Sequence, residues 1–173
     1  MRITTAAYTI LSVFCFILSS AMAGERDDLQ QPLDNNAIFV ELGGGGMLLS
    51  LNYNRVLSKS ENYFVTGEIG VGPIPLVGGF VVPHNICFNY GQGNHLLLLG
   101  GGGSYYRGRT NASGFKDLVE SYQIVPIAGY RYQGDSGVNI KLYLSPLINI
   151  YGAPMYDNQK ILFYGGFAIG YGF

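Results

Sequence analysis

Residues 161–173 alternate strictly between large apolar and small side chains, and this pattern constrains the fold more than any other feature of the sequence. Apart from a gap at Gly165, the large apolar side chains fall on every second position: Ile161, Phe163, Phe167, Ile169, Tyr171 and Phe173. Most of the positions between them hold Gly or Ala. A period of two residues predicts a β-strand with one apolar face.

The composition indicates that this apolar face meets hydrocarbon. Only 12% of the residues are charged, whereas about 25% is usual for a soluble domain. The 14 Tyr, 10 Phe and 26 Gly residues match what a membrane-spanning barrel needs, namely aromatics at both interfaces and small residues where strands bend. The net charge of −1 argues against a nucleic-acid-binding protein.

Turn chemistry divides the rest of the chain into strand-like segments of roughly ten residues. We predict eight strands, at residues 37–45, 47–57, 63–72, 80–90, 95–106, 121–133, 138–150 and 161–173. Short polar turns at 58–62, 91–94 and 134–137 alternate with longer connections at 73–79, 107–120 and 151–160. The first connection is the exception, because Gly43–Gly46 leaves room only for a tight hairpin. An even number of strands places both chain ends on one side of a barrel.

The last strand resembles the C-terminal strand of bacterial outer-membrane β-barrels, in which alternating apolar residues and a terminal Phe form the assembly signal. Here the matching residues are Ile169, Tyr171 and Phe173. The mature chain as a whole resembles the small OmpA- and OmpX-type barrels. The resemblance implies an all-β, eight-stranded antiparallel up-and-down transmembrane β-barrel in the cell outer membrane. Its implied partners are outer-membrane lipid, lipopolysaccharide and the barrel-assembly machinery.

A soluble lipocalin-like barrel is the alternative fold, since it shares the alternation and a secretory signal. It would need charged residues on its outward faces. In this sequence the charges lie mostly in turns, loops and the N-terminal segment. We therefore predict the membrane barrel.

The N-terminal region predicts export from the cytoplasm. Residues 1–23 have the form of a signal peptide, with Arg2, an apolar stretch at 6–18 and a cleavage site ending at Ala23. Residues 24–36 form a polar periplasmic lead-in, and residues 37–173 form the barrel. The apolar stretch is short for a membrane anchor, and Phe14 before Cys15 does not fit a lipoprotein signal. Cleavage would leave only Cys87, so we predict no disulfide, metal site or cofactor.

The polar face of the strands predicts a charged barrel interior. If the more apolar faces meet lipid, then four charged residues point inward: Glu41, Glu68, Arg131 and Lys141. Side chains just fill the interior of an eight-stranded barrel. Because an isolated charge in low dielectric is very costly, these groups should pair. The prediction is a packed polar network, and a narrow pore in which the pairs exchange partners is the alternative.

His84 is the outlier, because its strand alternation places it on the apolar face, where an unsatisfied polar group costs several kcal/mol. We interpret Pro83 as the site of a β-bulge that turns His84 inward. The alternative is a functional role, as in lipid A-modifying barrels. The deacylase type has a Ser two residues after its His, and Ile86 occupies that position here. We therefore predict a non-enzymatic structural or surface-interaction barrel whose extracellular ligand is unspecified, with a lipid A acyl hydrolase or transferase as the alternative.

Overall fold

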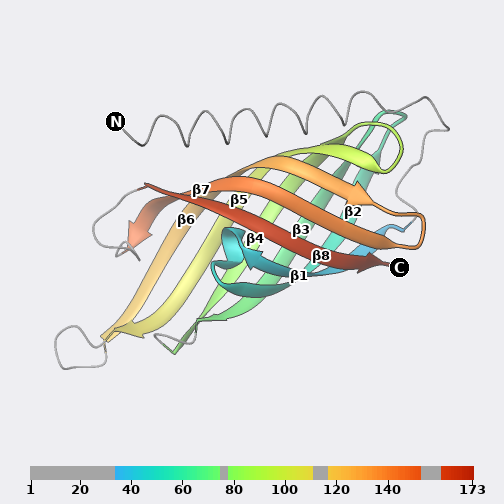
Figure 1. The fold of residues 1–173 in the computed structure, drawn as a ribbon. Helices are drawn as coiled ribbons and strands as arrows, with labels where there is room; N and C mark the ends of the chain where they lie inside the picture. Colours follow the sequence, from blue (N-terminus) through green and yellow to red (C-terminus); the bar gives the residue numbers. More distant parts are fainter. Residues whose placement is uncertain (1–33, 75–77, 111–116, 153–160) are drawn as a thin grey trace, which may run out of the picture.

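The structure, a computed structural model, describes residues 34–74, 78–110, 117–152 and 161–173. Its strands are β1 (Asn36–Gly43), β2 (Leu49–Lys59), β3 (Tyr63–Ile74), β4 (Gly79–Tyr90), β5 (His95–Thr110), β6 (Asp117–Gln133), β7 (Val138–Gly152) and β8 (Ile161–Gly172). Each strand pairs antiparallel with the next, and β1 pairs with β8 to close the barrel (Figure 1). This confirms the predicted eight-stranded antiparallel up-and-down fold.

β5 and β6 are longer than the sequence pattern predicts. Their pairing continues past Arg107↔Glu120 to Thr110↔Asp117, so the predicted loop at 107–120 is strand at both ends. In Figure 1 these two strands reach well beyond the β1–β2 hairpin. The sequence pattern misses this extension because polar residues favour a loop. In a solvent-exposed hairpin, however, polar residues can continue the backbone hydrogen-bond ladder. Arg107 and Glu120 form an exposed ion pair there, with 3.4 Å between Nε and Oε1.

The connection between β1 and β2 turns into the barrel interior (Figure 1). It contains a single 3₁₀ turn, η1 (Gly44–Gly46), whose three glycines are all buried. Gly44 has a positive φ of 58°, and a Cβ on it would overlap the Tyr143 hydroxyl, so only glycine fits at that position. Ser104 donates a hydrogen bond to the carbonyl oxygen of Gly45 (2.6 Å), and Tyr164 donates one to that of Met47 (2.7 Å). We call residues 44–47 the inner plug.

Side chains alternate between the two sides of the barrel wall with inverted polarity. Outward positions are apolar and exposed, such as Leu51 at 54% and Ile86 at 60% of their full surface. Inward positions are buried and mostly polar, such as Asn52 at 1%. Apolar side chains fill the remaining interior in clusters, one of which gathers around Leu98, Val125 and Leu147.

Several predictions from the sequence fall on parts of the chain that the structure does not describe. The predicted signal peptide (1–23) and most of the lead-in (24–36) are among them, as are residues 75–77, 111–116 and 153–160 of the three predicted outer loops. Within the described ranges, the structure has no helix long and apolar enough to cross a membrane.

Two neighbouring glycines of β5 should respond differently to substitution. A Cβ on Gly102 would overlap the backbone of His84 and Asn85, whereas a Cβ on Gly101 would meet nothing closer than a carbonyl oxygen at 3.6 Å. We expect Gly102→Ala to lower the free energy of unfolding by about 1–3 kcal/mol. Gly101→Ala should change it by less than about 0.5 kcal/mol. Urea unfolding of both variants in detergent micelles measures this difference, and equal effects would contradict the close strand approach at Gly102.

Candidate functional site

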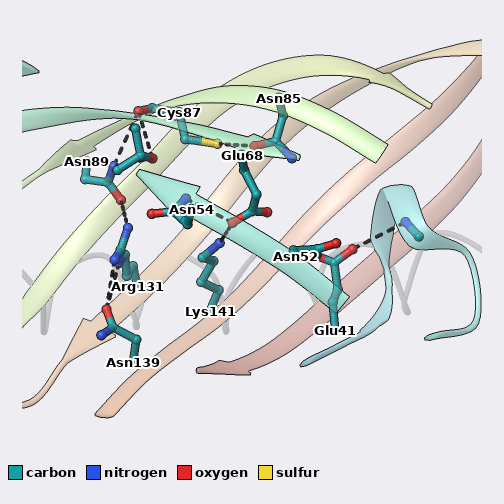
Figure 2. Close-up of polar contacts among 12 residues, drawn as sticks. Glu41, Asn52, Asn54, Glu68, Asn85, Cys87, Asn89, Arg131, Asn139 and Lys141 are labelled. Carbon is teal, nitrogen blue, oxygen red and sulfur yellow. Dashed lines mark hydrogen bonds and ion pairs between the residues drawn. The ribbon is translucent and has the colours of Figure 1, made fainter. Parts of the chain in front are cut away.

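The structure places all four predicted lumen charges inside the barrel. Glu41, Glu68, Arg131 and Lys141 are buried to at least nine-tenths, on inward positions of β1, β3, β6 and β7. Figure 2 shows them in three groups, each completed by asparagine side chains. Strand alternation places these residues inside the barrel, because the chain neighbours of each one lie at outward positions.

Lys141 and Glu68 form the buried ion pair of the lumen (Figure 2). The Glu68 carboxylate also accepts a hydrogen bond of 2.9 Å from the Asn54 side-chain amide. The Lys141 ammonium lies 3.7 Å from the centre of the Phe39 ring, which adds a cation–π contact. The register explains the asparagine partner, because Asn54 and Glu68 are directly opposite on β2 and β3. Each member of the pair therefore has a second favourable contact besides the ion pair.

Arg131 is held by amides and rings instead of a carboxylate. Its guanidinium donates hydrogen bonds to the side-chain oxygens of Asn139 (2.8 Å) and Asn89 (3.4 Å). The same group lies 5.2 Å from the ring centre of Phe64 and 5.6 Å from that of Phe39. The prediction that both cations pair with carboxylates is thus wrong for Arg131. Neutral amide oxygens and aromatic faces reach it at the end of the lumen near the short turns, where neither glutamate lies within ion-pair distance.

Glu41 supports the inner plug. Its carboxylate accepts hydrogen bonds from the Asn52 amide (3.0 Å) and from the backbone N–H of Gly46 (3.3 Å). Tyr143 supplies a further side-chain hydrogen bond. The prediction of an ion pair is therefore wrong for Glu41 as well. Hydrogen bonds to the carboxylate take the place of an ion pair here, and they fix the turn of the β1–β2 hairpin inside the barrel.

His84 faces outward, and the predicted β-bulge at Pro83 is absent. The pairings of β4 with β3 and with β5 keep one register on both sides of Pro83, so the side-chain alternation is not interrupted. Pro83 itself is buried on the inward side, and His84 is half-buried on the outer wall. The interpretation that His84 turns inward is wrong, because proline at this position interrupts only bridge hydrogen bonds and leaves the strand phase unchanged.

Tyr122 on β6 satisfies His84 on the outer wall. The Nε2 atom of His84 lies 2.8 Å from the Tyr122 hydroxyl, across Gly103 of the intervening strand β5. The Nδ1 atom of His84 lies 3.4 Å from the carbonyl oxygen of Val82. A carbonyl can only accept, so this contact favours the tautomer with the proton on Nδ1, in which Nε2 accepts from Tyr122. Glycine at position 103 leaves room for this contact, because a Cβ there would overlap the Tyr122 hydroxyl.

The sequence reasoning missed Tyr122 and Gly103 as partners of His84. They lie on different strands, and only the combined register of β4, β5 and β6 brings them together. The one usable signal was a glycine at an outward position in the middle of a strand, which often marks close approach of other groups.

The structure also locates the second histidine of the sequence, the C-terminal residues of the predicted assembly signal, and Cys87. His95 is exposed and forms a hydrogen bond with Tyr130 at the end of the barrel opposite the β5–β6 extension. Ile169, Tyr171 and Phe173 all point outward and are exposed. Cys87 is buried in the lumen, with its Sγ 3.5 Å from the Asn85 oxygen. In the ranges that the structure covers, no group of three or more His, Cys, Asp or Glu residues could hold a metal ion.

Comparison with known proteins supports the fold and nothing finer. No protein-family model matches the sequence, and no curated protein matches it. Among solved structures, the chain is similar to the N-terminal β-barrel domain of Pseudomonas aeruginosa OprF, with a TM-score of 0.57 and 13% sequence identity. The match covers 80% of this chain and 97% of that domain. The chain therefore has the fold of the small, OmpA-like outer-membrane barrels.

Proposed function

We propose that this protein is an outer-membrane β-barrel with a structural or surface-interaction role and a lumen that side chains fill. The inversion of polarity across the wall carries this proposal. Ile69, on the outer side, exposes 55% of its surface, while its neighbour Glu68 exposes 8% on the inner side. Water would favour the opposite arrangement, and hydrocarbon favours this one.

Aromatic side chains at both ends of the apolar wall support a membrane-spanning orientation. Tyr63, Phe88 and Tyr90 cluster near the short turns, with ring centres 4.8 Å apart between Tyr63 and Phe88. Phe80 and Tyr105 pack together near the opposite end. Aromatic belts of this kind mark the two interfaces of a bilayer. With the short turns in the periplasm, the connections β3–β4, β5–β6 and β7–β8 lie on the side of the cell exterior and carry the interaction role.

From the proposed outer-membrane location we also infer partners. The outward apolar residues contact phospholipid and lipopolysaccharide, and the apolar face of β8 with Ile169, Tyr171 and Phe173 is the contact for the barrel-assembly machinery. Catalysis has no support in the described residues, because the hydrogen bonds of His84 go to the Tyr122 hydroxyl and the Val82 carbonyl and not to a serine or an acidic side chain. A pore has none either, because the inner plug and the charge network occupy the lumen.

Electrophoretic migration tests the barrel itself. We expect the chain to fractionate with outer membranes, to resist extraction by carbonate, and to migrate faster on gels before boiling than after it, because a closed barrel resists detergent unfolding. A chain that stays dispersed without detergent and shows one migration rate would refute the membrane barrel.

Planar-bilayer recording tests the filled lumen. The plug, the Lys141–Glu68 pair and the apolar clusters occupy the lumen, so we expect no conductance above background from the inserted protein. Stepwise channel openings at low voltage would contradict the proposal. A plug variant, Ser104→Ala, removes the hydrogen bond to Gly45 and serves to show whether any conductance comes from plug movement.

Removing one partner of the buried pair should be far more harmful than removing both. Lys141→Met leaves the Glu68 carboxylate buried without a cation, and we expect a loss of about 3–5 kcal/mol in the free energy of unfolding. The double variant Glu68→Gln/Lys141→Met should recover much of that loss. Arg107→Met is the matched control, because it breaks an exposed pair worth about 0–1 kcal/mol. Urea unfolding in micelles measures all three, and equal losses for Lys141→Met and Arg107→Met would show that the lumen pair is not buried.

A further inference from the structure

The outer wall of β2–β5 carries a groove that ends at His84. It has a volume of about 390 Å³, which lies within the range of roughly 300–1,000 Å³ of small-ligand sites. Glycines make it, because outward positions 67 and 101 carry no side chain on either side of the prominent Ile86. Its lining is almost wholly apolar and includes Leu57, Gly67, Ile69, His84, Ile86 and Gly101. The groove therefore fits an acyl chain.

Polar side chains line this groove at His84 on β4 and at Tyr53 on β2, and the Tyr53 hydroxyl donates its proton to Asn36. Outward-facing residues that pair across neighbouring strands form rows around the barrel. His84 lies one row closer to the short turns than Tyr105 and Tyr122, and three rows from Tyr63 and Tyr90 at the short-turn end. One further row out lies the ion pair of Arg107 and Glu120. If the barrel has the orientation of the proposed function, on which this inference rests, the His84 end lies in the outer leaflet at the depth where acyl chains join the headgroup.

The hydrogen bonds at the His84 end select the chemistry of the ligand. Tyr122 uses its proton on His84 Nε2, and the Nδ1 proton of His84 is directed to the Val82 carbonyl. The free capacity that remains on this pair is the lone pairs of the Tyr122 oxygen, which can only accept. A ligand that binds there must bring a donor, such as a hydroxyl or an amide N–H. Acyl esters of ordinary phospholipids have no donor at that depth.

The groups around Tyr105, Glu120 and Arg107 also favour a ligand that donates hydrogen bonds. The Tyr105 hydroxyl is hydrogen-bonded to Glu120, whose carboxylate is also paired with Arg107. Side-chain exposure of 47% for Arg107 and 38% for Glu120 leaves both groups accessible to a headgroup. Carboxylate and phenol oxygens accept from sugar hydroxyls, and the guanidinium donates to sugar or phosphate oxygens.

We propose that this wall binds one outer-leaflet glycolipid with amide-linked or hydroxylated acyl chains. One acyl chain lies in the glycine groove beside Ile86. The donor at the head of that chain hydrogen-bonds the Tyr122 oxygen, and the saccharide lies against Arg107 and Glu120. His84 is a positioning residue, because it fixes the Tyr122 hydroxyl so that its oxygen accepts from the lipid.

Native mass spectrometry of the full chain, purified from envelopes and titrated in micelles, tests the groove. The probes are lipid A, which carries amide-linked and hydroxylated chains, and phosphatidylethanolamine, which has only ester-linked chains. We expect one bound lipid A, with an affinity at least tenfold above that for phosphatidylethanolamine. Gly101→Leu fills the groove and should weaken lipid A binding at least fivefold. Gly165→Leu is the matched control, because it makes the same change at an open outward position on β8.

A pair of tyrosine variants tests the acceptor. Tyr122→Phe removes the oxygen and should abolish the preference for lipid A, while the weaker phosphatidylethanolamine binding stays unchanged. Tyr130→Phe is the control, since it removes the corresponding hydroxyl from the His95–Tyr130 contact at the other end of the barrel. It should leave the preference intact.

The outcomes separate this inference from the proposed function. Faster gel migration before boiling is recorded for every sample and reports the barrel independently of lipid. Folded protein that binds both lipids equally, or Gly101→Leu and Gly165→Leu variants with equal affinity, would overturn the glycolipid site and leave the barrel standing. Loss of the migration difference in the unaltered chain would overturn the barrel itself.

Discussion

The pairing of β1 with β8 is the contact on which the rest of the molecule depends. Residues 37–43 of β1 pair in register with residues 166–172 of β8, and this ladder removes the last two free edges of the sheet. In hydrocarbon every unpaired backbone group costs several kcal/mol, so an open sheet of these strands could not remain there. Closure with eight strands also sets the width of the interior, which side chains must then fill.

Within that fixed width, the lumen is stabilised by hydrogen bonds to charged groups more than by ion pairing. One carboxylate and one ammonium meet directly, while Glu41 is satisfied by an amide, a backbone N–H and a phenol. Arg131 lies among two amide oxygens and two phenylalanine rings. Asparagine serves both signs of charge because its side chain carries a donor and an acceptor. This explains why asparagine lies directly opposite Glu68, as Asn54, and one inward position along from the residues opposite Glu41 and Arg131, as Asn52 and Asn139.

Alternation was sufficient to predict which side of the wall each side chain occupies. The period of two residues predicts Glu68 and Lys141 inside and Ile169 and Phe173 outside, and the structure has them there. Contacts between strands were less accessible. Which lumen groups meet depends on shear and on the inner plug, and neither leaves a periodic signal in one strand.

His84 shows the same limit from the outer side. The alternation of β4 predicts that His84 faces outward, as the structure shows. The cost of a polar group in lipid instead favours a β-bulge that turns His84 inward, and the register excludes that bulge. The actual solution is a tyrosine two strands away, reached over a glycine, and pattern reasoning within one strand could not find it. The polar β5–β6 extension was missed for a related reason, since turn-like composition outweighed a ladder that cross-strand pairs maintain in water.

The inner plug makes the rim of the barrel uneven in height. On one side the β1–β2 hairpin descends into the interior, and on the other the β5–β6 hairpin rises well past it (Figure 1). In the proposed orientation, the β5–β6 hairpin stands farther from the bilayer than the β1–β2 connection. A large partner arriving from that side would therefore meet the β5–β6 side of the barrel first.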